Sequence, residues 1–192
     1  MEMNVSIEGI APLLMNNPAS MSSQKSGKSV TYDPQVEAEA RLYKNAAGIM
    51  YVPSTHILAA IREAGSDFKI PGKGKKTFKK VLYGLIRVTP EQIPVISDSG
   101  WEIDARYAVI NRSRVMKWRP KFNTWKLDFK VSTVTDDSIY PGTLREILES
   151  AGTFNGVGDF RPLFGLFKVT SFKDANGKEI GGGIAVAAGK KK

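Results

Sequence analysis

The sequence lacks cysteine, and its 192 residues include a single histidine. Without cysteine the chain can form no disulfide, thiol nucleophile or cysteine-ligated metal centre, a composition compatible with the cytoplasm. A zinc site needs several nitrogen or sulfur ligands, and one histidine cannot supply them. His56 would also have to serve any serine triad, and no nucleophile-elbow sequence accompanies it. We therefore expect no catalytic residue, no metal site and no cofactor, and we interpret His56 as a capping or surface residue.

Long apolar runs are also missing, because none approaches the roughly 20 residues that span a membrane. The first residues, Met1 to Asn4, lack the basic start and apolar core of a secretion signal. The glycine fingerprints of P-loop and dinucleotide-binding proteins are absent as well. These absences favour a cytoplasmic protein with no membrane partner.

Positive charge, in contrast, is in excess. The chain carries 28 Lys and Arg against 19 Asp and Glu, a formal net charge of +9. Such an imbalance favours a polyanionic partner, with nucleic acid as the first candidate. The excess is concentrated in segment 111–130, where Asp128 is the single acidic residue among the basic side chains Arg112, Arg114, Lys117, Arg119, Lys121, Lys126 and Lys130.

The pattern of apolar residues indicates a mixture of strands and helices. Hydrophobic residues make up 42% of the sequence, which excludes a wholly disordered chain. Periodicity predicts strands at 4–10, 49–52, 86–88, 125–134 and 166–172, and helices at 34–44, 54–64, 77–85 and 143–152. The last helix carries a capping box, Thr143 with Glu146, and we expect Gly152 to end it. Segments 106–110 and 114–118 are either the arms of a hairpin or two core strands.

This order of elements has no strict βαβ rhythm and favours the α+β class. We expect one domain over residues 1–180, with an antiparallel, ferredoxin-like (RRM-like) sheet covered by helices on one face. Added to it are a mobile insert near 16–33, a basic insert near 66–80 and basic loops or a hairpin. Residues 181–192 are expected to form a flexible basic tail.

The first candidate site is a glycine-punctuated segment, 156–167. Gly156 and Gly158 follow a helix and could form a nest of backbone N–H groups that holds a phosphate. The alternative is a tight connection that needs positive φ. Phe160 and Arg161 add a stacking face and a phosphate-binding guanidinium. Asp159 could instead pair with Arg161 and serve only to shape the loop.

The second candidate site is the basic and aromatic segment 112–122. As a strand it would place Arg114, Met116 and Trp118 on one face, and Val115 and Lys117 on the other. Interleaved cations and aromatic rings suit single-stranded nucleic acid, since they offer charge for phosphates and flat faces for bases. The predicted contacts are Arg112, Arg114, Lys117, Trp118, Arg119, Lys121 and Phe122. The alternative is a solvated strand whose Trp118 fills the core.

The lysine-rich insert is a third and less specific candidate. Lys73, Lys75 and Lys76 could clamp a phosphate backbone beside the other two sites. Runs of lysine are otherwise ordinary solvated surface.

Three motifs in this order resemble a family of small phage and prophage proteins. They are Pro12-Leu13-Leu14-Met15, then Ser113-Arg114-Val115-Met116 with Arg119-Pro120 and Phe122, and last Ala151-Gly152 leading to Gly156-x-Gly158-Asp159-x-Arg161-Pro162-x-Phe164-Gly165-x-Phe167. The architecture of that family is similar to the RAMP superfamily, above all to the backbone subunits of CRISPR effector complexes.

The resemblance implies a ferredoxin-like core with a glycine-rich loop, here at Gly156, Gly158 and Gly165, and a thumb-like basic hairpin near 112–121. It also implies subunits that polymerise along the strand, each gripping a few nucleotides. RAMP endoribonucleases have a second histidine, which this sequence lacks.

The sequence thus leads to a hypothesis with two alternatives. The chain is expected to bind single-stranded DNA or RNA without sequence preference, to be non-catalytic and to form a homo-oligomer or filament along the strand. Its compartment would be the cytoplasm, that of the bacterial host if a phage encodes it. The alternatives are a RAMP-like endoribonuclease and a structural or protein-interaction component of a phage.

Overall fold

The computed structural model describes residues 1–19, 33–110, 112–134 and 139–182. Most of the predicted mobile insert at 16–33 and of the predicted tail at 181–192 lies outside the described residues. Helices and antiparallel sheets are mixed in the chain, as expected of the α+β class. None of the helices in these four ranges has both the length and the apolar character of a membrane span.

The main sheet has four strands in the order β4-β8-β1-β9. They are β1 (Glu2–Gly9), β4 (Ile86–Thr89), β8 (Lys126–Thr133) and β9 (Phe167–Asp174). Each neighbouring pair is antiparallel. Strict alternation buries Met3, Val5 and Ile7 of β1 and turns the polar residues between them to the opposite face.

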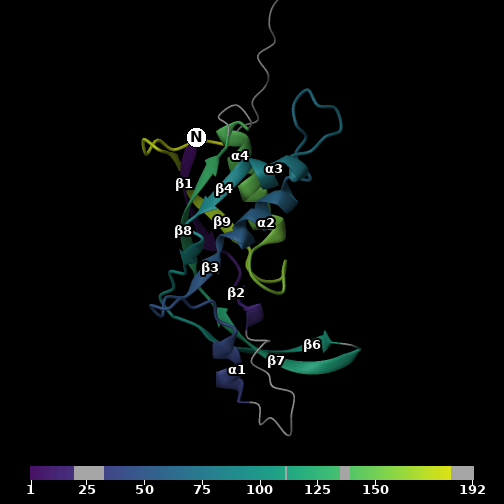
Figure 1. Cartoon of the computed structure of the whole chain (residues 1–192), viewed down its shortest axis with the longest axis vertical. Coiled ribbons are helices and arrows are strands. Elements are labelled where there is room, and N and C mark those ends of the chain that lie inside the picture. The colour runs from purple at the N-terminus through teal and green to yellow at the C-terminus, as the bar shows by residue number, and fades with distance from the viewer. Residues whose placement is uncertain (20–32, 111, 135–138, 183–192) are drawn as a thin grey trace, which may run out of the picture.

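Two helices cover the inner face of this sheet, α2 (Ser54–Ala64) and α4 (Pro141–Ser150) (Figure 1). The buried residues of α2 are Ile57, Ala60, Ile61 and Ala64, which is the spacing of one helical face. Those of α4 include Leu144, Ile147 and Leu148. Both sets join the inward residues of the four strands in one hydrophobic cluster. The outer face of the sheet is polar and carries the ion pairs Lys130–Glu2, Lys126–Glu8 and Lys168–Glu8.

A hairpin extends from this body (Figure 1). It consists of β6 (Glu102–Ile110) and β7 (Ser113–Phe122), and β2 (Leu13–Leu14) pairs with the base of β7. The hairpin interpretation of segments 106–110 and 114–118 is therefore correct. Helix α1 (Pro34–Ala40) packs on β7, and β3 (Tyr51–Pro53) pairs with β5 (Gln92–Pro94). Helix α3 (Lys79–Leu85) lies beside α2.

The ends of α4 differ from the prediction. The helix begins at Pro141, two residues before Thr143, and no side chain caps it. Thr143 is buried within the first turn, so the predicted capping box does not form. The chain also does not leave the helix at Gly152 but continues as a π-helical turn, η2 (Ala151–Asn155), until Gly156 takes a φ of +68°. Gly152 is required by packing instead, since a Cβ there would lie 2.2 Å from the carbonyl oxygen of Phe167.

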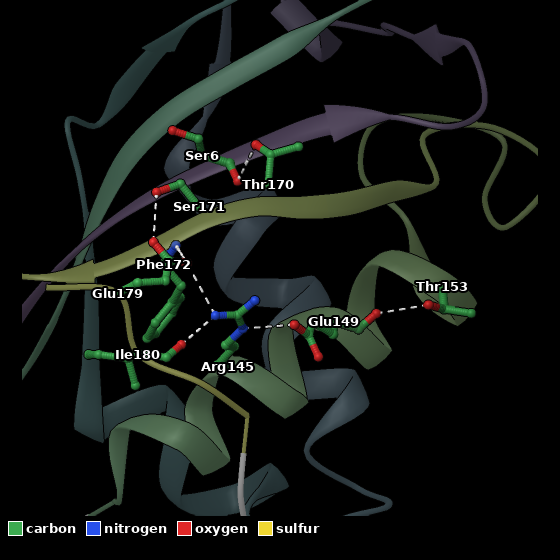
Figure 2. Close-up of polar contacts among 9 residues, drawn as sticks. All are labelled: Ser6, Arg145, Glu149, Thr153, Thr170, Ser171, Phe172, Glu179 and Ile180. Carbon is green, nitrogen blue, oxygen red and sulfur yellow. Dashed lines mark hydrogen bonds and ion pairs between the residues drawn. The ribbon is translucent and has the colours of Figure 1, made fainter.

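The C-terminal end of the described chain is fastened to α4 through Arg145 (Figure 2). Its Nε donates to Glu149 Oε1 at 2.8 Å, and its Nη1 contacts both Glu179 Oε1, at 3.2 Å, and the carbonyl oxygen of Ile180. Glu179 Oε1 also accepts from the backbone N–H of Phe172 at 3.0 Å. These contacts hold β9, and with it the end of the glycine-punctuated segment, against the helices.

Candidate nucleic-acid interface

The hairpin has two chemically different faces. The β6–β7 register places Val109 opposite Arg114, Tyr107 opposite Met116 and Ala105 opposite Trp118, so these six residues share one face. Tyr107 is 62% exposed and Val109 is 73% exposed. We call this the outer face of the hairpin. The grouping of Arg114, Met116 and Trp118 agrees with the sequence prediction.

The opposite face of the hairpin lies towards the rest of the protein, and its lysines form ion pairs. Lys117 Nζ lies 3.7 Å from Glu37 Oε1 on α1, and Glu37 also contacts Arg41 at 2.6 Å. Lys121 Nζ lies 2.6 Å from Glu102 Oε1 across the hairpin. Lys117 and Lys121 therefore have carboxylate partners within the chain, and a phosphate would compete with those partners.

Two of the predicted contacts are buried, and the structure corrects them. Phe122 has no exposed surface, because it pairs with Leu13 of β2 and packs in the core. It cannot stack on a base. Arg119 is 6% exposed, and its Nε forms an ion pair with Asp159 Oδ2 at 2.7 Å. Arg119 thus links the hairpin to the glycine-punctuated segment, and in this structure it is not available to a phosphate.

The glycine loop, residues 156–165, is shaped by its own backbone contacts. Gly156, Gly158 and Gly165 have φ values of +68°, +82° and +74°, as a tight connection requires. The backbone N–H groups of Gly156, Val157 and Asp159 donate to carbonyl oxygens of this protein at 2.8–2.9 Å. A phosphate nest needs successive free donors, and these three are already engaged. The nest interpretation is therefore wrong.

Close backbone approach explains why glycine stands at these positions. A Cβ at Gly165 would lie 1.7 Å from the carbonyl oxygen of Val157. A Cβ at Gly158 would lie 2.5 Å from the carbonyl oxygen of Leu14, the residue that accepts from the Asp159 N–H. The loop is thus packed onto β2, which itself pairs with the hairpin.

Between the loop and the hairpin lies a cluster of arginines and phenylalanines. The guanidinium of Arg106 lies 4.4 Å from the ring centroid of Phe164, and that of Arg119 lies 5.6 Å from the centroid of Phe160. Arg106 Nε also contacts Asp104 Oδ1 at 2.6 Å. Phe160 is 41% exposed, so one part of its ring remains open to a ligand. Sequence reasoning missed Arg106, although strand alternation places it on the same face as Asp104.

Arg161 is exposed, its charge acts on His56 and Glu63 of α2, and the predicted pairing with Asp159 is replaced by the Arg119–Asp159 ion pair. Burial lowers the pKa of His56 below its usual value, and the positive charge of Arg161 lowers it further, while Asp159 opposes the shift. The His56 ring meets that of Tyr43 edge-on, with centroids 5.5 Å apart. The capping interpretation of His56 is wrong, because α2 has no side-chain cap and the imidazole is half-buried. Burial also raises the pKa of Tyr43, with further contributions from Tyr51 and Asp159.

The lysine loop, residues 69–77, is closed at its neck by a bridge between Lys69 and Thr77. The backbone N–H of Phe78 donates to the carbonyl oxygen of Phe68 at 3.0 Å just below that bridge. Lys73, Lys75 and Lys76 stand on the exposed tip, where none of them pairs with a carboxylate of the described residues. The lysine loop and the hairpin project on the same side of the body, with the glycine loop between them (Figure 1).

Comparison of the sequence with protein-family models and with curated proteins finds no match.

Proposed function

We propose that this protein binds single-stranded nucleic acid, DNA or RNA, without reading its sequence, and that copies pack side by side along the strand. The observation that carries the proposal is an array of exposed cations on the hairpin, the glycine loop and the lysine loop, none of them in an ion pair within the described part of the chain. Arg112 and Arg114 stand at the hairpin tip, and Arg161 stands on the glycine loop. The lysine loop, which projects on the same side of the body as the hairpin (Figure 1), adds Lys73, Lys75 and Lys76. Such an array can neutralise successive phosphates of one strand.

Aromatic and apolar groups beside these cations favour a single strand over a duplex. Tyr107 and Trp118 lie on the outer face of the hairpin with Arg114, and Phe160 is exposed next to Arg161. Unpaired bases stack on such rings, whereas the bases of a duplex are stacked on one another. Sequence tolerance follows because every base offers a flat face.

The outer face of the main sheet is a poorer candidate surface. Its side chains along β1 and β8 are acidic, basic, amide-bearing or hydroxyl-bearing, and several are paired with one another. None of the side chains that β1, β4, β8 and β9 turn outward is aromatic. An RRM-type stacking platform on the sheet is therefore not part of the proposal.

We further propose that the core is ferredoxin-like and that the protein is similar to RAMP backbone subunits. Elements β1, α2, β4, β8, α4 and β9 follow one another as βαββαβ, with the strands in the spatial order second, third, first, fourth. This order and the antiparallel pairing support a ferredoxin-like core with the hairpin and the lysine loop as insertions. The place of action would be the bacterial cytoplasm.

Fluorescence anisotropy with labelled single-stranded DNA, single-stranded RNA and duplex tests the binding, and electron microscopy of the same mixtures tests the assembly. We expect both single strands to bind more tightly than duplex and to form filaments with the protein. No binding to any of the three would overturn the proposal and leave a structural or protein-interaction role in a phage.

A second candidate function, RNA cleavage, is favoured by one observation. Burial lowers the pKa of His56, which packs edge-on against Tyr43, and the charge of Arg161 lowers it further, so the neutral imidazole is favoured at neutral pH. A neutral imidazole can accept a proton from a ribose hydroxyl. Incubation of labelled RNA with the protein in the presence of a chelator distinguishes the two functions. Cleavage that His56→Ala abolishes would establish the enzyme, and intact RNA bound by the protein would favour the binding function alone.

A further inference from the structure

The neighbouring helices α2 and α3 together carry an arginine–tyrosine pair. Arg62, in the last turn of α2, holds its guanidinium 5.7 Å from the ring centroid of Tyr83 on α3. Tyr83 is 61% exposed. The pair therefore presents a large aromatic surface to solvent, with a cation against one side of it.

The guanidinium of Arg62 has unused hydrogen-bonding capacity. Its Nε is buried and finds no hydrogen-bond partner within the described part of the chain. A guanidinium also donates through its two terminal nitrogens, which are the groups that a phosphate oxygen would contact here. The nearby carboxylate of Glu63 is already engaged by Lys79 Nζ at 2.8 Å.

A second cation accompanies the ring. Lys80 precedes Tyr83 by three residues on α3, so the two side chains lie on neighbouring positions of one helical face. Lys80 is exposed and has no ion pair with the described residues. Helix α3 follows the lysine loop directly. The hydrogen bond from Lys79 is the main cause that lowers the pKa of Glu63, and the positive charge of Arg161 on the glycine loop lowers it further.

We propose that Arg62, Lys80 and Tyr83 form a nucleotide-binding position that joins the lysine loop to the glycine loop. The exposed ring of Tyr83 stacks on one base of a single strand, and the two cations hold the adjacent phosphates. This inference rests on the proposed function, because it extends the same strand across α2 and α3. It makes the interface continuous from the lysine loop to the glycine loop.

Binding of labelled oligo(dT) and oligo(U) to wild type, Tyr83→Ala, Tyr83→Phe and Lys80→Ala tests the position. Tyr83→Ala is expected to lower the affinity about 5- to 150-fold and to leave its salt dependence unchanged, since stacking involves no charge. Tyr83→Phe keeps the ring and should bind as wild type. Lys80→Ala should reduce the slope of log affinity against log salt by about 0.7, the value of one phosphate on a single strand.

The control for charge is Lys168→Ala on the outer face of the main sheet, where Lys168 Nζ lies 3.2 Å from Glu8 Oε2. It should change neither affinity nor slope. Thermal unfolding of each variant separates lost binding from lost folding. If Tyr83→Ala binds the oligonucleotides as tightly as the wild-type protein does, the proposed nucleotide-binding position is wrong and the proposed function still stands. Wild-type protein that fails to bind either oligonucleotide would overturn the proposed function itself.

Discussion

Arg119 Nε of β7 and Asp159 Oδ2 of the glycine loop lie 2.7 Å apart in an ion pair whose arginine side chain is only 7% exposed and whose aspartate side chain is 30% exposed. The pair connects two segments that are distant in the sequence and fixes how the loop sits against the base of the hairpin. Both side chains are thereby used within the protein. The glycine loop connects the hairpin to the core, and its Phe160 and Arg161 remain exposed, which is where the proposed function places contacts with nucleic acid.

We predict that Asp159→Asn destabilises the protein without reducing the salt dependence of nucleic-acid binding. The substitution leaves the guanidinium of Arg119 buried without a countercharge, at a cost of about 1–3 kcal/mol. Urea denaturation measures the change in stability, and titrations of an oligonucleotide at several salt concentrations measure the slope. An unchanged free energy of unfolding would contradict the structural role of the pair.

We predict that Arg112→Asn combined with Arg114→Ala weakens binding to single strands and flattens the salt slope by about 1.4, or 0.7 for each phosphate that is no longer neutralised. Asparagine is chosen at position 112 because Arg112 has a φ of +67°, which asparagine tolerates. Both side chains are exposed, so the free energy of unfolding should change by no more than about 0.5 kcal/mol.

The matched control for this pair removes the same number of charges from the outer face of the main sheet. Lys126→Ala with Lys168→Ala deletes two lysines that both lie within 4.0 Å of Glu8. An equal decrease in affinity in the two double variants would mean that net charge matters and the hairpin does not.

We predict that Gly165→Ala is far more damaging than Gly74→Ala. Both glycines have positive φ, at +74° and +62°, so the conformational strain of alanine is similar. At Gly165 the new Cβ would lie 1.7 Å from a backbone oxygen, whereas at Gly74 nothing lies within 4 Å. We expect the stability to fall by about 1 kcal/mol at Gly74 and by about 3–5 kcal/mol at Gly165 in urea denaturation. Similar decreases in stability at the two positions would show that the positive φ alone, and not close backbone approach, explains why glycine stands there.

We predict that the pKa of His56, followed by the NMR signal of the only imidazole in the sequence, lies below 6.5 and rises in Arg161→Ala. The folded state then binds fewer protons than the unfolded state at mildly acidic pH. The contribution of His56 to stability is therefore complete above pH 6.5 and is lost as the pH falls towards the folded pKa. His56→Gln should make stability less sensitive to pH in that window. A titration unaffected by Arg161→Ala would contradict the proximity of the two side chains.

Local patterns in the sequence predicted the features that depend on neighbouring residues. Two-residue alternation in 125–134 and 114–118 indicated the strands and their faces, because side chains of a strand point to opposite sides in turn. The spacing of Ile57, Ile61 and Ala64 predicted α2, because residues three or four positions apart lie on one face of a helix. The positive φ of Gly156 and Gly158 also agrees with the interpretation of the loop as a tight connection.

Features that depend on distant partners were not predictable in this way. Phe122 is buried because Leu13 lies opposite it, and Arg119 is neutralised by Asp159. Neither partner is near in the sequence, so basic and aromatic residues of one segment were all counted as ligand contacts. Only the long-range pairing separates the exposed Arg112 and Arg114 from Arg119 and Phe122, which hold the structure together.

The most direct test of the central claim is the affinity of the wild-type protein for a labelled single strand, measured by anisotropy over a series of salt concentrations. If about four phosphates are neutralised by each subunit, log affinity should fall against log salt with a slope near −3. A measurable affinity with that slope would support binding along the phosphate backbone. An affinity independent of salt, or no binding at any salt concentration, would contradict it.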